Sequence, residues 1–170
     1  MNIKDALIQE NSKENAERIA QHIGTDPDKF AELMTLFLDD GHHLTQRAAW
    51  PLSKCIDRHP ELLSPYLERV ILNLQTDGLP VAVKRNTVRI LQEVAVPEAL
   101  LGPLAEVCFQ FLESGDEPIA VKVFSMTILF NITKKEPDLK NELRLLIEAQ
   151  LPYGSAGFKA RAKKILPHLQ

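Results

Sequence analysis

The sequence has few of the residues that build cross-linked, turn-rich or membrane-spanning proteins. Of 170 residues, two are cysteine, seven are glycine and 6% are aromatic. Two cysteines cannot supply a disulfide framework, and seven glycines are too few for a turn-dense all-β chain. No run of about 18 apolar residues occurs, so we expect no membrane span. The first residues lack the apolar core of a signal peptide, and we therefore predict a cytoplasmic protein with reduced thiols.

The residues that are abundant favour helices. Leucine occurs 25 times, whereas the β-branched residues valine and isoleucine together occur 21 times. Leucine is a strong helix former, and β-branched residues prefer strands. The length suits one domain or one short repeat array. A formal net charge of −3 argues against a protein that coats nucleic acid non-specifically.

Proline is common, with eleven copies, and its positions are ordered. Four prolines open similar segments at spacings of 33, 37 and 40 residues, and they are Pro27, Pro60, Pro97 and Pro137. Each is followed by an acidic residue, and proline with an acid is favourable in the first turn of a helix. Pro80 and Pro118, 38 residues apart, precede a second apolar helix in their segments. A period of 33 to 40 residues with two helices in each unit indicates a repeat protein.

The spacing of apolar residues sets the register of these repeats. Val83, Thr87, Ile90 and Leu91 share one helical face, and equivalent residues follow 38 and 75 positions later. This pattern predicts helices near 2–9, 12–23, 27–39, 42–58, 60–76, 80–95, 98–114, 118–134, 137–150 and 155–169. It also predicts one α-solenoid domain over 1–170, with N-terminal cap helices in 1–26 and repeats at about 27–59, 60–96, 97–136 and 137–170.

The repeats resemble those of the HEAT-like family. Each family repeat has a proline-opened first helix, a turn with aspartate, and a second helix with Val-Arg followed by a small residue. Here Val83-Lys84 is followed by Thr87, and Val121-Lys122 by Ser125, with lysine in place of arginine. The resemblance implies an all-α, right-handed α-α superhelix of about nine or ten helices, as in HEAT and armadillo solenoids. It further implies that the second helices line a concave face that serves as an interaction surface.

Charge separates by helix type in this register. The predicted first helices and their turns sum to −11, while the second helices sum to +10. If the second helices line the concave face, that face is mildly basic and suits an acidic or extended peptide, or a phosphate backbone. The candidate partner surface consists of Arg47, Trp50, Lys54, Arg58, Arg85, Asn86, Arg89, Glu93, Thr127, Asn131, Arg161, Lys164 and His168. Trp50 lies at the flank of the expected core, which favours packing over a role as ligand anchor.

Other chemistry-bearing stretches have simpler structural interpretations. Residues 39–43 combine acids and histidines, but adjacent side chains diverge, so a helix–helix turn is expected rather than a metal site. Residues 154–159 form a glycine-containing stretch without the phosphate-loop pattern and fit a loop with a helix cap. They also lack the signature of the mobile loop in helical lyases. Cys55 occupies an exposed register position, but we expect a packed thiol rather than a nucleophile. We predict no catalytic residue, no cofactor and no metal.

Three functional hypotheses follow from the sequence. The first is a non-catalytic scaffold that binds a protein or an acidic peptide on its concave face. The second is a nucleic-acid-binding or DNA-repair-related protein that uses the same basic face, by analogy with HEAT-like alkylpurine glycosylases. The third and most remote is a small helical enzyme. The sequence leaves the partner, the pathway and the oligomeric state open.

Overall fold

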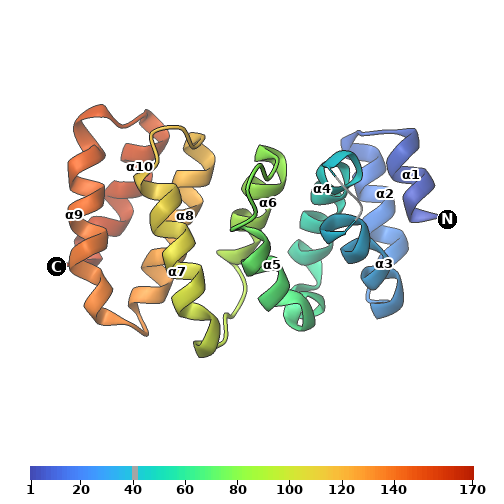
Figure 1. The fold of residues 1–170 in the computed structure, drawn as a ribbon, viewed down its shortest axis with the longest axis horizontal. Helices are drawn as coiled ribbons and strands as arrows, with labels where there is room; N and C mark the ends of the chain where they lie inside the picture. The colour runs from blue at the N-terminus through green and yellow to red at the C-terminus, as the bar shows by residue number, and fades with distance from the viewer. Residues whose placement is uncertain (40–41) are drawn as a thin grey trace. The chain divides into compact units, whose positions relative to one another are not determined.

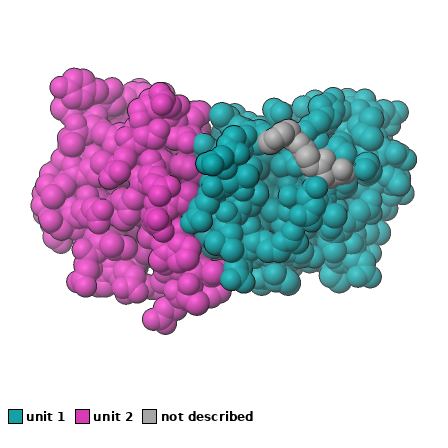
Figure 2. Space-filling view, viewed as in Figure 1, with its two compact units in different colours: residues 1–94 teal, residues 95–170 magenta. Residues whose placement is uncertain are grey.

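The fold is known from a computed structural model that describes residues 1–39 and 42–170, and Figure 1 shows it as a ribbon. The described residues form ten α-helices, four short 3₁₀ helices and no strand. The chain divides into two compact units, residues 1–94 and 95–170, which Figure 2 colours separately. The predicted all-α solenoid architecture of nine or ten helices is confirmed, whereas the predicted repeat boundaries stay predictions.

The first unit contains six α-helices and one 3₁₀ helix. Their bounds are α1 (Ile3–Gln9), α2 (Lys13–Ile23), α3 (Pro27–Leu38), α4 (His42–Arg58), η1 (Pro60–Tyr66), α5 (Leu67–Asn73) and α6 (Val81–Leu91). The second helices of the repeats, α2, α4 and α6, pack against one another in sequence order. The first helices form the other layer, where α3 contacts both α1 and η1. Fully buried side chains such as Ile19, Phe30 and Phe37 fill the space between these layers.

The second unit repeats this arrangement with fewer helices. Its elements are α7 (Glu98–Glu113), α8 (Ile119–Thr133), η2 (Pro137–Leu139), α9 (Lys140–Gln150), η3 (Leu151–Tyr153), α10 (Ala156–Ile165) and η4 (Leu166–His168). The second helices α8 and α10 pack together, and the first helices α7 and α9 do the same. Residues such as Leu104, Val121, Ile128 and Leu143 are buried in the core of this unit.

The predicted register of the second helices agrees with the observed burial. Val83, Thr87, Ile90 and Leu91 are all buried in α6. Most equivalent residues of the second unit are buried as well, and they include Val121, Ser125, Ile128 and Leu129 in α8, and Phe158, Ala162 and Ile165 in α10. Leu166, the equivalent of Leu91, lies in η4 and is only partly buried. The 3.6-residue periodicity therefore identified the core-facing side of these helices correctly.

Proline accounts for most of the differences from the predicted helix bounds. The segment predicted as one helix over 60–76 is a 3₁₀ helix over Pro60–Tyr66 followed by α5. Pro65 has no N–H to donate to the carbonyl four residues earlier, so the first turns cannot close as an α-helix. At α3, by contrast, Pro27 occupies the first turn, and the Asp26 side chain accepts from the backbone N–H groups of Asp28 and Lys29. These bonds favour the carboxylate and lower the pKa of Asp26.

Candidate functional site

The candidate partner surface is divided between the two units. In the first unit it comprises residues on α4 and at or just after α6, namely Arg47, Trp50, Lys54, Arg58, Arg85, Asn86, Arg89 and Glu93. In the second unit it comprises Thr127 and Asn131 on α8, Arg161 and Lys164 on α10, and His168 on η4. We call the first part the α4–α6 surface and the second the α8–α10 surface.

Two arginines of the α4–α6 surface are held by acids on the preceding second helix. Arg58 of α4 forms an ion pair with Glu17 of α2. Arg89 of α6 donates from Nη2 to both carboxylate oxygens of Asp57 on α4, each at 3.0 Å. Both pairs are partly exposed, so each stabilises the fold only modestly. Their main effect is to neutralise positive charge that the sequence assigned to this surface.

Arg47 hydrogen-bonds to the backbone at the end of α1. Its Nη1 donates to the carbonyl oxygens of Leu7 at 2.8 Å and Ile8 at 2.7 Å. These carbonyls belong to the last turn of α1, which has no intrahelical donors for them. The side chain therefore joins α4 to the end of α1 and is not available as a simple ligand contact.

The second helices are also joined by polar links that recur from repeat to repeat. In the first unit, Ser53 Oγ of α4 donates to Asn86 Oδ1 of α6 at 3.1 Å. In the second unit, Arg161 of α10 donates to the hydroxyl of Thr127 on α8. The linked residues are 33 and 34 positions apart, close to one repeat. Asn86, Thr127 and Arg161 therefore help hold adjacent second helices together.

A pocket of about 270 Å³ opens on the α4–α6 surface. Its lining comes from three places in the sequence: the loop between α1 and α2, helix α4 and helix α6. The lining residues are Asn11, Gln46, Trp50, Ala82, Arg85 and Asn86. Three of them, Trp50, Arg85 and Asn86, belong to the candidate surface, so the structure brings these together. Sequence reasoning missed Asn11, because a loop residue outside the repeat register gives no periodic signal.

Trp50 and Arg85 are the two large side chains of this pocket. Trp50 is 38% exposed, although the neighbouring Pro51 is buried. Within the described part of the chain, Arg85 has no hydrogen-bond or ion-pair partner, unlike Arg58 and Arg89. The pocket thus presents an aromatic face and an uncompensated cation.

The α8–α10 surface contains one aromatic cluster near its end. The rings of Phe130 and His168 lie 5.8 Å apart, and the ammonium of Lys134 lies 4.8 Å from the Phe130 ring centroid. Lys134 also donates to Asn131 Oδ1 at 3.2 Å. Lys164 is exposed to solvent on α10. These contacts place His168 and Asn131 in one local cluster around Phe130 and Lys134.

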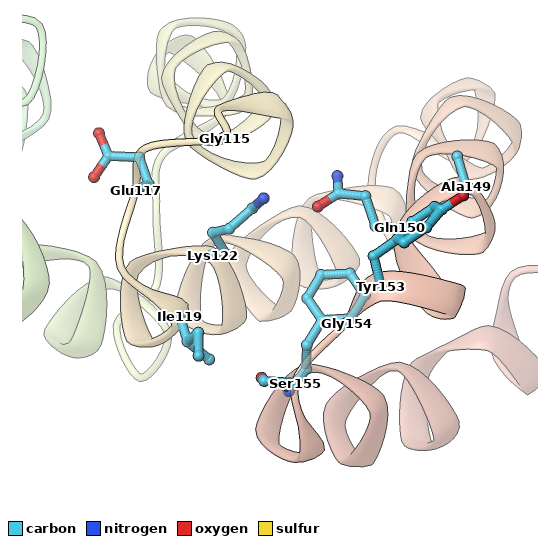
Figure 3. Close-up of a pocket in the computed structure, with 10 residues that line it drawn as sticks. Gly115, Glu117, Ile119, Lys122, Ala149, Gln150, Tyr153, Gly154 and Ser155 are labelled. Atoms are coloured by element: carbon cyan, nitrogen blue, oxygen red, sulfur yellow. Dashed lines mark hydrogen bonds between the residues drawn. The ribbon is translucent and has the colours of Figure 1, made fainter.

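A second pocket, of about 390 Å³, lies within the second unit and is shown in Figure 3. It is lined by the loop between α7 and α8, the start of α8, and the connection from α9 to α10. The lining residues are Gly115, Glu117, Ile119, Lys122, Ala149, Gln150, Tyr153, Gly154, Ser155 and Phe158. Three of them, Gly154, Ser155 and Phe158, come from the glycine-containing stretch that the sequence predicts as a loop with a helix cap.

That prediction agrees with the geometry at the start of α10. Ser155 is the N-cap, and its hydroxyl accepts from the Phe158 backbone N–H at 3.2 Å. A Cβ atom at Gly154 would lie 2.7 Å from Cδ1 of Phe158, which is too close for any side chain. Glycine at this position is therefore required by packing against the buried Phe158 ring.

Neither cysteine has the environment of a nucleophile. Cys55 and Cys108 are both buried, and burial raises the pKa of each thiol to about 12. The register had placed Cys55 at an exposed position, but its side chain is only 1% exposed. The reason is that α4 is packed between α2, α3 and α6, so more of its circumference is covered than in a terminal repeat.

The acidic and histidine-containing turn at 39–43 lies partly outside the described residues. Asp39 accepts from Arg69 Nη2 at 2.8 Å, and His43 is exposed. Asp40 and Gly41 lie outside the described residues, so the predicted turn stays a prediction. Over residues 1–39 and 42–170, no group of three potential metal ligands occurs, and no helix is long and apolar enough to cross a membrane.

Comparison with known proteins adds one positive finding. A family model described as a HEAT repeat domain matches residues 3–169. Comparisons with curated proteins and with solved structures gave no match. The family match covers both compact units and every helix described above.

Proposed function

The chain belongs to the HEAT repeat family, and from this premise we propose that it is a non-catalytic scaffold that binds a protein or an extended acidic peptide. Repeats of this kind bury their cores against their neighbours and leave extended helical surfaces for recognition. A reducing compartment such as the cytoplasm suits the two unpaired thiols. We retain the single-domain organisation and its four repeats as part of the proposal.

The observation that carries the proposal is the pocket around Trp50 and Arg85. Tryptophan and arginine are the residues most often found at the energetic centre of protein interfaces. Here an exposed indole lies in the same pocket as an arginine without an internal partner. Three amide side chains, Asn11, Gln46 and Asn86, also line the pocket, and each has both a donor and an acceptor, as a peptide group does.

The polar groups of the pocket are held in place before any ligand arrives. Asn86 Nδ2 donates to the Ala82 carbonyl at 2.7 Å while its Oδ1 accepts from Ser53, which fixes the amide plane. The corner that carries Asn11 is fixed by Asn15, whose Nδ2 donates to the carbonyl oxygens of Ala6 and Glu10, both at 2.7 Å. Such preorganisation reduces the entropy that binding must overcome.

Charge favours an acidic partner at this site. The pocket is lined by Arg85 and by five uncharged residues, so no acid among its lining residues neutralises the guanidinium. An extended peptide could place a carboxylate on the Arg85 guanidinium, its main-chain groups on the amides and an apolar side chain on Trp50. We favour a peptide over nucleic acid, because Arg58 and Arg89 are already paired with carboxylates.

Trp50 provides the means to test the proposal, because it is the one tryptophan in the sequence. A library of extended peptides, with and without acidic residues, is titrated while the Trp50 emission is followed. Labelled peptides that bind are then measured by anisotropy against Trp50→Ala, Arg85→Glu and the control Leu72→Ala, an exposed apolar residue on α5. We expect the first two variants to weaken binding at least about tenfold, and the control to leave it unchanged.

Two outcomes would count against the proposal. Equal loss in the control and in Arg85→Glu would show that the pocket is not the binding site. Tight, strongly salt-dependent binding of duplex or single-stranded DNA, without binding of any peptide, would favour the nucleic-acid hypothesis instead.

A further inference from the structure

The pocket of the second unit differs in character from the one around Trp50 and does not belong to the candidate partner surface. All ten residues that line it lie between 115 and 158, within the second compact unit. Its volume of about 390 Å³ is within the range of small-ligand sites. Its lining residues indicate which chemical class of ligand would fit it.

Lys122 is the residue of the pocket whose charge most restricts the choice of ligand. It lies on α8 and is partly buried, and burial lowers the pKa of its ammonium. Within the described residues it has neither a hydrogen bond nor an ion pair. In Figure 3 its side chain points toward Gln150, while the Glu117 carboxylate points away from it. A partly desolvated cation without a partner favours an anionic group placed beside it.

Gln150 supplies a second, oriented polar group. Its Nε2 donates to the Leu112 carbonyl at 2.8 Å, which fixes the amide and leaves Oε1 as an acceptor. A ligand that places an anion on Lys122 can therefore donate an N–H to Gln150 from the adjoining atoms. The arrangement of an anion beside an N–H donor is that of an acylated amino acid, with its carboxylate next to its amide.

The remaining lining combines the polar Glu117 and Ser155 with apolar side chains, two of which are unusually exposed. Tyr153 is 91% exposed and Ile119 is 52% exposed, whereas Phe158 is buried. Covering exposed apolar side chains is favourable in proportion to the area removed from water. The ligand that meets all three demands has a carboxylate, a neighbouring amide N–H and an apolar side chain.

We propose that this pocket binds the α-carboxylate end of an N-acylated apolar amino acid, either as the C-terminal residue of a peptide or as a free small molecule. Lys122 pairs with the carboxylate, Gln150 Oε1 accepts from the amide N–H, and the side chain covers Ile119 and Tyr153. This site is independent of the proposed scaffold function and does not involve Trp50.

The test uses three probes on the full chain, with binding followed by backbone amide NMR shifts. The probes are acetyl-leucine, a pentapeptide that ends in leucine with a free carboxylate, and the same pentapeptide with a C-terminal amide. We expect the two carboxylates to bind in the millimolar range or tighter, with shifts in residues around the pocket. Tighter binding of the pentapeptide would indicate that the natural ligand is the C-terminus of a peptide chain. Tighter binding of acetyl-leucine would indicate that it is a free small molecule.

Two comparisons make the proposal falsifiable. Lys122→Met keeps the length of the side chain and should weaken carboxylate binding about tenfold, whereas the exposed Lys163→Met on α10 should leave it unchanged. Equal binding of the amidated and the free pentapeptide by the wild-type chain would overturn the proposal without relying on a variant. Absence of shifts from all three probes at millimolar concentration would also overturn it.

Discussion

Replacing Asn15 by alanine should destabilise the first unit strongly for a single polar substitution. Asn15 is buried, and its Nδ2 donates two hydrogen bonds of 2.7 Å, to the carbonyls of Ala6 and Glu10. Its Oδ1 accepts from Arg18 at 2.7 Å. The side chain thus connects the end of α1 to α2 through two bonds that remove carbonyl groups from water, and a third bond links it to Arg18 within α2.

The expected magnitude follows from these bonds. Each buried hydrogen bond contributes about 1 kcal/mol net, and a buried carbonyl left without its donor adds to that loss. The higher helix propensity of alanine offsets about 0.5 kcal/mol. We therefore expect the free energy of unfolding to fall by about 2 kcal/mol in Asn15→Ala, and by more in Asn15→Asp, which also places a carboxylate against two carbonyl oxygens.

The assay is urea unfolding followed by Trp50 fluorescence, which reports the unit that contains Asn15. With a slope of about 1 to 2 kcal/mol per molar urea, the midpoint should fall by about 1 to 2 M. Gln21→Ala on the exposed side of α2 is the control and should shift the midpoint little. A change below about 0.5 kcal/mol in Asn15→Ala, or one equal to the control, would refute the reasoning.

Three further predictions concern caps, glycines and ion pairs. Because the pKa of Asp26 is lowered, its carboxylate cap stabilises α3 at pH values above the unfolded-state pKa. This stabilisation is lost as the pH falls through the folded-state pKa. The variant Asp26→Asn should therefore show a weaker decrease of Tm with falling pH. Gly24 has a φ of +52°, so Gly24→Ala should lower the free energy of unfolding by about 1 to 3 kcal/mol in the same urea assay. Gly102 lies inside α7 with open space around it, so Gly102→Ala should raise the free energy of unfolding by about 0.5 to 1 kcal/mol. Arg89→Met should lower the free energy of unfolding by at most about 0.5 to 1 kcal/mol in 0.1 M salt, because the ion pair with Asp57 is partly exposed. A larger decrease would show that this ion pair stabilises the fold more than a surface pair does.

The sequence predicted the helices and their buried faces well because both follow from local periodicity. The bounds of α4 agree with prediction, and the residues spaced from Val83 to Leu91 are buried as expected. Where prediction failed, the cause was either backbone chemistry or the number of neighbours. Pro65 turned the start of one predicted helix into a 3₁₀ segment, and the central position of α4 buried Cys55.

The candidate site was harder to predict, because the sequence gives the charges but not their partners. Arg58 and Arg89 were counted as available cations, yet each meets an acid on the preceding second helix. Asn11 entered a pocket only because the α1–α2 corner folds beside α4 and α6. Lys122 was noted only as a lysine in place of the family's arginine, and it lines a pocket in which its side chain points toward Gln150 in Figure 3.

The two buried thiols make this chain convenient for site-specific labelling. Burial raises the pKa of each thiol to about 12, so neither forms much thiolate at neutral pH, and both are also shielded from reagents. A cysteine introduced on the surface would therefore react with maleimide dyes long before Cys55 or Cys108, without removal of either native residue. Dye pairs placed one in each unit would then report the distance between residues 1–94 and 95–170 in single molecules.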